Sequence, residues 1–168
     1  MRIFAFAVMA LLLTVGVARA ETFPVVTDKT VIKECGECHM VFPPQTLPKA
    51  SWEKIMATLS DHFGENAVMD PAAAANILAF HVANSSDVSD VRAAVKWRVR
   101  ETLARITDAP RFVSKHKQCG PEVWAHKQVR SKANCLACHP TMNVNGSTDA
   151  KMKFLPAELQ RKCGEGDD

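Results

Sequence analysis

The pentapeptide Cys-x-x-Cys-His occurs twice in this 168-residue chain, at Cys35–His39 and at Cys135–His139. On a helical turn its cysteines lie at i and i+3 and its histidine at i+4, so the three side chains share one face. This pattern is typical of c-type haem attachment, with both thiols bonded to the porphyrin edge and the imidazole on the iron. A zinc site is the alternative, but zinc motifs space their cysteine pairs far more tightly than the roughly 100 residues found here. We therefore expect two covalently bound haems c, attached through Cys35, Cys38, Cys135 and Cys138.

The amino terminus has the pattern of a secretory signal peptide. Arg2 supplies a positive charge, residues 3–17 form an apolar stretch, and Ala18-Arg19-Ala20 is a small-x-small cleavage site before Glu21. An uncleaved anchor is the alternative, although an apolar stretch of about 15 residues is short for a bilayer. We expect cleavage of residues 1–20 and export of a soluble mature chain to the periplasm, with no later segment inserted in the membrane.

Charge and length limit what the mature chain can be. It retains 19 Lys and Arg against 18 Asp and Glu, so its net charge is close to neutral and argues against a nucleic-acid partner. Two haems would leave about 74 residues for each, so porphyrin is expected to form much of the apolar core.

The polar turn at residues 84–87 separates the two motifs. We place the boundary between an N-terminal haem lobe, residues 21–86, and a C-terminal haem lobe, residues 87–168, at this turn.

Helix signals dominate both lobes, and alternating strand patterns are scarce. Asp70-Pro71 predicts a helix that runs to about Asn84, and Pro110 and Pro121 each predict the start of a short helix. Residues 91–106 are predicted to form a longer amphipathic helix, and a tail helix is expected near Pro156. The predicted fold class is all-α, with two small helical haem-binding lobes.

An iron used only for electron transfer has both axial positions filled, so each haem needs a ligand besides His39 or His139. In the first lobe the candidates are His62 and His81. His62 ends an apolar stripe in the segment 51–64. The helix around His81 is apolar on nearly every side, so the position of His81 on that helix does not show whether its side chain faces a haem. We favour His62, with His81 as the alternative.

In the second lobe the candidates for this ligand are His116 and His126. Phe112 and Val113 precede His116 at i−4 and i−3 on the predicted helix from Pro110, so His116 projects among apolar neighbours. His126 is surrounded by charged residues, which is typical of a solvated surface. We favour His116 and keep His126 as the alternative.

Residues around the two motifs extend the pattern. In the first half they are Met40, Pro43-Pro44 and Asp61-His62-Phe63-Gly64-Glu65-Asn66, and in the second half they are Arg105-Ile106-Thr107, Pro110, Phe112, His116 and Asn134. Together with the motifs, they resemble the bacterial diheme cytochrome c family over residues 30 to about 140. The sequence departs from that family at Gln118-Cys119-Gly120 and after Pro140.

The resemblance implies two helical lobes, the first similar in fold to a class I cytochrome c, with each iron held by two histidines. Transferred to this sequence, His39 and His62 would ligate the first iron, and His139 and His116 the second. Members of the family pass electrons in the periplasm, in several cases to a small monohaem cytochrome that can bind oxygen, and some work beside a membrane cytochrome b.

These observations predict a carrier of single electrons, with other redox proteins as partners and no catalytic residue of its own. Irons closed by two imidazoles are expected to have low reduction potentials, unequal because their surroundings differ. A small haem enzyme or gas-binding protein is the alternative, and it would need one open iron site. A sensory or structural haem module is less favoured.

Cys119 and Cys163 remain after the four haem thiols are counted. In an oxidising compartment two such cysteines can form a disulfide, which would tie the tail helix to the second lobe. Two free thiols are the alternative, and the sequence alone leaves both open.

Overall fold

Short helices connected by long loops make up the protein in our computed structural model, which describes residues 21–164. The predicted signal peptide, residues 1–20, lies outside the described residues. The α-helices are α1 (Lys29–Gly36), α2 (Lys49–Ala57), α3 (Pro71–Ala83), α4 (Arg92–Trp97), α5 (Pro110–Lys115), α6 (Pro121–Trp124), α7 (Met142–Asn145) and α8 (Ala157–Gly164). Four 3-10 turns accompany them, η1 (Pro44–Thr46), η2 (Leu59–Asp61), η3 (Ile106–Asp108) and η4 (Cys135–Ala137). Residues 21–164 contain isolated bridges but no strand, which confirms the all-α prediction.

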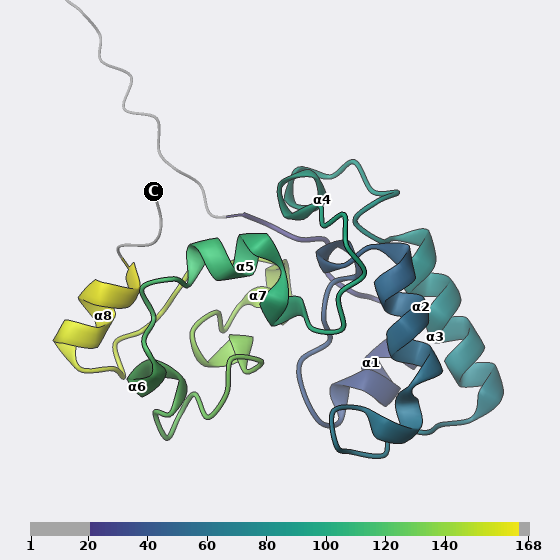
Figure 1. Ribbon diagram of the computed structural model, residues 1–168, viewed down its shortest axis with the longest axis horizontal. Coiled ribbons are helices and arrows are strands. Elements are labelled where there is room, and N and C mark those ends of the chain that lie inside the picture. Colours follow the sequence, from purple (N-terminus) through teal and green to yellow (C-terminus); the bar gives the residue numbers. More distant parts are fainter. Residues whose placement is uncertain (1–20, 165–168) are drawn as a thin grey trace, which may run out of the picture.

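Helices α1, α2 and α3 form one end of the molecule (Figure 1). The predicted cap of α3 is confirmed, because the Asp70 side chain accepts hydrogen bonds from the first backbone N–H groups of the helix. Helices α2 and α3 pack against each other through Trp52 and His81, whose ring centres are 4.3 Å apart, and Ile77 of α3 is fully buried. The indole N–H of Trp52 donates to the backbone oxygens of Pro44 in η1 and of Leu47 just after it, which ties that turn to α2.

Helices α5 to α8 form the other end (Figure 1). The predicted starts of α5 at Pro110 and of α6 at Pro121 are confirmed, as is the tail helix α8 after Pro156. Two small clusters of buried residues hold this end together. One contains Val99, Ala109 and Phe112, and the other contains Cys119, Val123 and Leu155.

The turn at residues 84–87 packs into the first helical group. Ser85 and Ser86 are fully buried, and the backbone N–H of Ser86 donates to Leu47 at 3.0 Å. The Asp87 carboxylate accepts from the backbone N–H of Lys49, at the start of α2. Because α4 follows this turn and contacts both η1 and α5, the chain passes between the two groups without an exposed linker. The division at residue 86 stays a prediction.

Two predicted helices are shorter in the structure. The helix expected over residues 91–106 ends at Trp97, because the chain then extends to bury Val99 and to donate from the Leu103 N–H to the Ser51 hydroxyl. The helical stripe expected over residues 51–64 is also wrong, since α2 ends at Ala57. In the segment 91–106 these tertiary contacts outweigh the local preference for helix.

Residues 21–23 precede the first helical group in the chain but contact α4 and the second group. The Glu21 carboxylate pairs with Arg111 and Lys96 and accepts from the indole N–H of Trp97 at 2.9 Å. The Glu21 carbonyl accepts from Thr148, so this one residue touches α4, α5 and the loop after α7. Burial alone would raise the pKa of Glu21, but the hydrogen bonds and the charge of Arg111 outweigh it, so the net effect lowers this pKa.

The lowered pKa of Glu21 predicts a stability contribution that is complete above the carboxyl's unfolded pKa and disappears as pH falls through its folded pKa. We expect Glu21→Gln to reduce the free energy of unfolding by about 1–2 kcal/mol at pH 7, since it removes charge-assisted hydrogen bonds. Urea unfolding of both proteins at pH 7 and pH 3 measures this. A difference that stays the same at both pH values would contradict the assignment.

Candidate haem-binding sites

The first motif lies at the end of α1, with Cys35 in its last turn and Cys38 and His39 just beyond it. The Nδ1 atom of His39 lies 2.7 Å from the carbonyl oxygen of Met40. Because a carbonyl only accepts, Nδ1 carries the proton and Nε2 keeps a lone pair for a metal. The ring centre of His62 lies 6.1 Å from that of His39, and the two ring planes are inclined by 25°.

A tight turn presents His62. Its backbone exchanges hydrogen bonds with Glu65, and the two central residues have positive φ angles, 61° at Phe63 and 99° at Gly64. Such angles favour glycine and are unusual for phenylalanine. The Arg105 guanidinium lies 4.0 Å from the centre of the Phe63 ring and covers this turn from the C-terminal half. Burial, followed by the charges of His39 and Arg105, lowers the pKa of His62 and favours its neutral form.

The alternative ligand His81 lies in the helix core instead. Only 3% of its surface is exposed, its Nδ1 donates to Ile77, and its ring packs on Trp52 and Phe80. The structure therefore pairs the rings of His39 and His62, whereas His81 packs with aromatic residues of α2 and α3.

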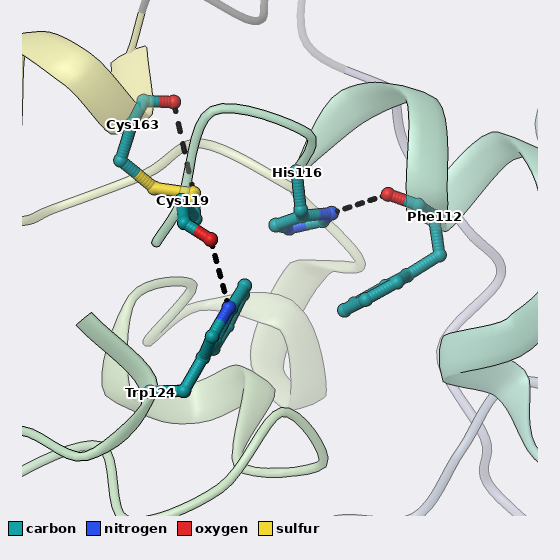
Figure 2. Close-up of a disulfide and its surroundings, with 5 residues drawn as sticks. All are labelled: Phe112, His116, Cys119, Trp124 and Cys163. Atoms are coloured by element: carbon teal, nitrogen blue, oxygen red, sulfur yellow. Dashed lines mark hydrogen bonds between the residues drawn. A yellow bond between two sulfur atoms is a disulfide. The ribbon is translucent and has the colours of Figure 1, made fainter. Parts of the chain in front are cut away.

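The second motif begins in η4, and the backbone N–H of His139 closes a helical turn by donating to Cys135 at 2.8 Å. The ring centres of His139 and His116 are 6.1 Å apart, with their planes at 89°. His116 follows α5, and its Nδ1 donates to the Phe112 carbonyl at 2.9 Å (Figure 2). Its ring stacks on Phe112 at 4.1 Å and lies 5.9 Å from Trp124.

His126, the alternative in this half, lies on the loop after α6. Its ring is 5.5 Å from that of Phe154, and its Nδ1 accepts from the backbone of Gln128. The described ring contacts pair His139 with His116 rather than with His126.

Both spacings fit two imidazoles on one iron. With about 2 Å for each bond from metal to imidazole nitrogen, and about 1 Å from that nitrogen to its ring centre, two ligands on opposite sides have ring centres about 6 Å apart. The observed value is 6.1 Å in each pair. Each pair also contains one histidine, His39 or His116, whose Nδ1 is held by a backbone carbonyl.

A cavity of about 410 Å³ lies beside the second pair. Cys135, Cys138, His116 and His139 line it together with apolar and aromatic side chains, so it presents the attachment residues to an apolar ligand. Burial raises the pKa of Cys135 to about 11 and also raises that of Cys138.

Phe42 belongs to both sites. Its ring centre lies 5.0 Å from that of His39, and the same side chain lines the cavity that contains Cys135 and His139. Sequence reasoning missed Phe42, and also missed Trp124 and Glu21, which line this cavity. An aromatic three residues after a motif histidine was the available signal for Phe42, whereas the cavity contacts of Glu21 depend on tertiary packing.

Cys119 and Cys163 form a disulfide, which decides between the alternatives that the sequence left open. Their Cα atoms are 4.4 Å apart. The bond joins the turn after His116 to α8, and the Cys119 carbonyl accepts from the Trp124 indole at 2.9 Å (Figure 2). The disulfide therefore supports the aromatic wall beside His116.

A comparison with protein families matches residues 31–145 to the dihaem cytochrome c family. The chain belongs to this family. As a member, it binds two haems c covalently and is an electron-transfer cytochrome. None of the helices in the described part of this dihaem cytochrome c is long and apolar enough to cross a membrane.

Solved structures of the same kind are similar to the chain. Two from Rhodobacter sphaeroides, one named DHC and one a diheme cytochrome c, share 37% and 39% identity with it. They cover 71% of this chain and 96% and 95% of their own, with TM-scores of 0.61 and 0.63. A diheme cytochrome c from Shewanella baltica OS155 has 28% identity, covers 71% of this chain and 85% of its own, and has a TM-score of 0.57. A search of curated proteins finds no match.

Proposed function

We propose that this dihaem cytochrome c is an exported, non-enzymatic carrier of single electrons, with each iron closed by two imidazoles. His39 and His62 hold the first iron, and His139 and His116 hold the second. The equal 6.1 Å separation of the two histidine pairs carries this proposal. The signal-peptide pattern of residues 1–20 supports export to the periplasm.

When bound, each haem c supplies an iron that gains and loses one electron. The residues of the chain keep that exchange fast, because two imidazoles, one of which in each pair donates from Nδ1 to a backbone carbonyl, need little movement between the two redox states. The aromatic wall of Phe112 and Trp124 shields His116 from water. Phe42, which contacts His39 and lines the second cavity, provides a short apolar connection between the sites.

The partners belong to the same proposal. A small monohaem cytochrome is a suitable acceptor and a membrane cytochrome b a suitable donor, as the family resemblance implies. Neither axial position is left for a substrate in this arrangement, so the protein conducts electrons and does not transform a bound molecule.

Electron paramagnetic resonance of the oxidised protein tests the ligation. We expect two different low-spin signals, because axial ring planes inclined by 25° and by 89° split the iron orbitals differently. Carbon monoxide added to the reduced protein should cause no stoichiometric spectral change. A substantial high-spin signal, or binding of one equivalent of carbon monoxide, would instead favour the alternative function, an enzyme or gas-binding protein with one open iron.

A further inference from the structure

Charge is divided unevenly between the two halves of the sequence. Residues 21–86 contain four Lys and Arg against eight Asp and Glu, a formal net charge of −4 with histidines neutral. Residues 87–168 contain fifteen against ten, a formal net charge of +5. The near-neutral total therefore hides a strong polarity, and the two haem motifs lie in halves of opposite formal charge.

A stretch without negative charge surrounds the second haem motif. Residues 123–148, which include that motif, contain no Asp or Glu. Within them Lys127, Arg130 and Lys132 are all exposed, and we call these three residues the basic loop. None of the three forms an ion pair with another residue of the described part, 21–164. Their charges are therefore available to a partner.

The basic loop has a fixed shape. Val129 lies between Lys127 and Arg130, and only 1% of its surface is exposed. Its buried apolar side chain anchors the loop to the protein. The Asn134 side chain donates to the Val129 carbonyl at 2.9 Å, and the backbone of Arg130 donates to His126. Arg130 has a φ of 68°, in the left-handed region, which turns the chain sharply between Lys127 and Lys132. A loop held this way loses little entropy when a partner docks.

The basic loop lies next to the second site. The ammonium of Lys132 is 6.0 Å from the centre of the Trp124 ring, and that ring is 5.9 Å from the ring of His116. Lys132 also lines the cavity that contains Cys135 and His139. One aromatic ring therefore separates the basic loop from a proposed iron ligand.

We propose that the basic loop is the docking surface for a redox protein with an acidic face, which exchanges one electron with the second haem. This inference rests on the proposed function, since it requires a carrier that meets another redox protein. Complementary charge speeds the encounter and sets its orientation more than it adds affinity. One electron leaves the partner and reduces iron(III) to iron(II), or the reverse, with no other change of bonding.

The N-terminal half makes this docking selective. Glu37, Asp61 and Glu65 are exposed around the first motif and the turn of His62, and residues 55–91 contain no Lys or Arg. These three carboxylates repel an acidic partner, with Arg105 over Phe63 as the opposing charge at this turn, whereas the basic loop attracts such a partner. The polarity thus directs such a partner to the second haem.

Stopped-flow reduction of the holoprotein by an acidic flavodoxin hydroquinone tests the proposal. We expect the second-order rate constant to fall steeply with ionic strength. The triple variant Lys127→Gln, Arg130→Gln, Lys132→Gln should react about tenfold or more slowly at low salt and lose most of the salt dependence. Freeze-quench electron paramagnetic resonance should show the signal of the perpendicular pair, His116 and His139, disappearing first.

The matched control is Lys29→Gln, Lys49→Gln, Lys54→Gln, which removes the same charge from exposed residues of the N-terminal half. We expect its rate to change less than about twofold, because these lysines lie outside the basic loop. The proposal would be overturned if both triple variants lost the same factor in rate, or if the variant of the basic loop reacted at the wild-type rate. Earlier reduction of the first haem than of the second would also overturn it. Failure of the proposed function is a separate result, visible as a high-spin signal in the unaltered protein.

An anionic membrane is the other surface that three exposed cations could meet. Vesicles with 30% phosphatidylglycerol serve as the probe at 150 mM salt. We expect no co-sedimentation of the holoprotein. Co-sedimentation that the test variant loses would assign the basic loop to lipid and overturn the proposal of a redox partner.

Discussion

Replacing His116 by alanine is expected to open the second iron to external ligands. The variant should bind one equivalent of carbon monoxide when reduced and should show a high-spin signal when oxidised, because the imidazole opposite His139 is gone. The reduction potential of that site should move by more than about 100 mV, since axial ligands control a range of roughly 0.8 V. Spectroscopic titration with carbon monoxide and a redox titration measure both effects.

The matched control for this variant is His126→Ala. His126 is the other histidine of this half, and its ring contacts Phe154 instead of His139. We expect its spectrum and its potential to stay unchanged. If His126→Ala opened the iron and His116→Ala did not, the assignment of the two histidines would be reversed.

A second variant separates ligation from folding. His116 stacks on Phe112 and lies against Trp124, so alanine also removes packing from the cavity wall. Methionine in its place fills similar space and offers a sulfur ligand. We expect His116→Met to keep a low-spin iron with a higher potential than the wild type. A structural role alone would leave the potential unmoved.

Short-range signals in the sequence predicted most of the helix starts. Asp70 caps α3 with its own side chain, and the prolines at 71, 110 and 121 fix the backbone angle φ at the first helical residue, so these starts depend on adjacent residues. The paired motifs likewise predicted two covalent haems, which family membership confirms. The chemistry of the motif is carried by five consecutive residues and needs no knowledge of the fold.

Sequence patterns did not predict the features of the fold that depend on contacts between distant residues. The segment 91–106 has helical periodicity, but a buried Val99 and the Ser51 hydroxyl hold its second part extended. His62 was favoured for a helical stripe that the structure replaces with a turn at Phe63 and Gly64. The structure still brings His62 to His39, so the favoured residue faces its expected partner for a different geometric reason.

Breaking the Cys119–Cys163 disulfide is expected to destabilise the second haem site and spare the first. The bond closes a loop with a sequence separation of 44, which contains α6, the second motif and α7. Chain entropy alone assigns about 4 kcal/mol to a loop of this length, and measured values are typically about 2–4 kcal/mol. We expect the double variant Cys119→Ala, Cys163→Ala to lose about 2–4 kcal/mol of unfolding free energy in urea.

The loss should be local because of what the bond supports. Cys119 is buried with Val123 and Leu155, and its carbonyl holds the indole of Trp124, which lies against His116. The low-spin signal of the second haem should therefore change at lower urea than that of the first. Dithiothreitol should shift the wild type in the same direction and leave the double variant unaffected. If reductant left the wild-type unfolding midpoint unchanged, the disulfide would have no part in holding the wall beside His116.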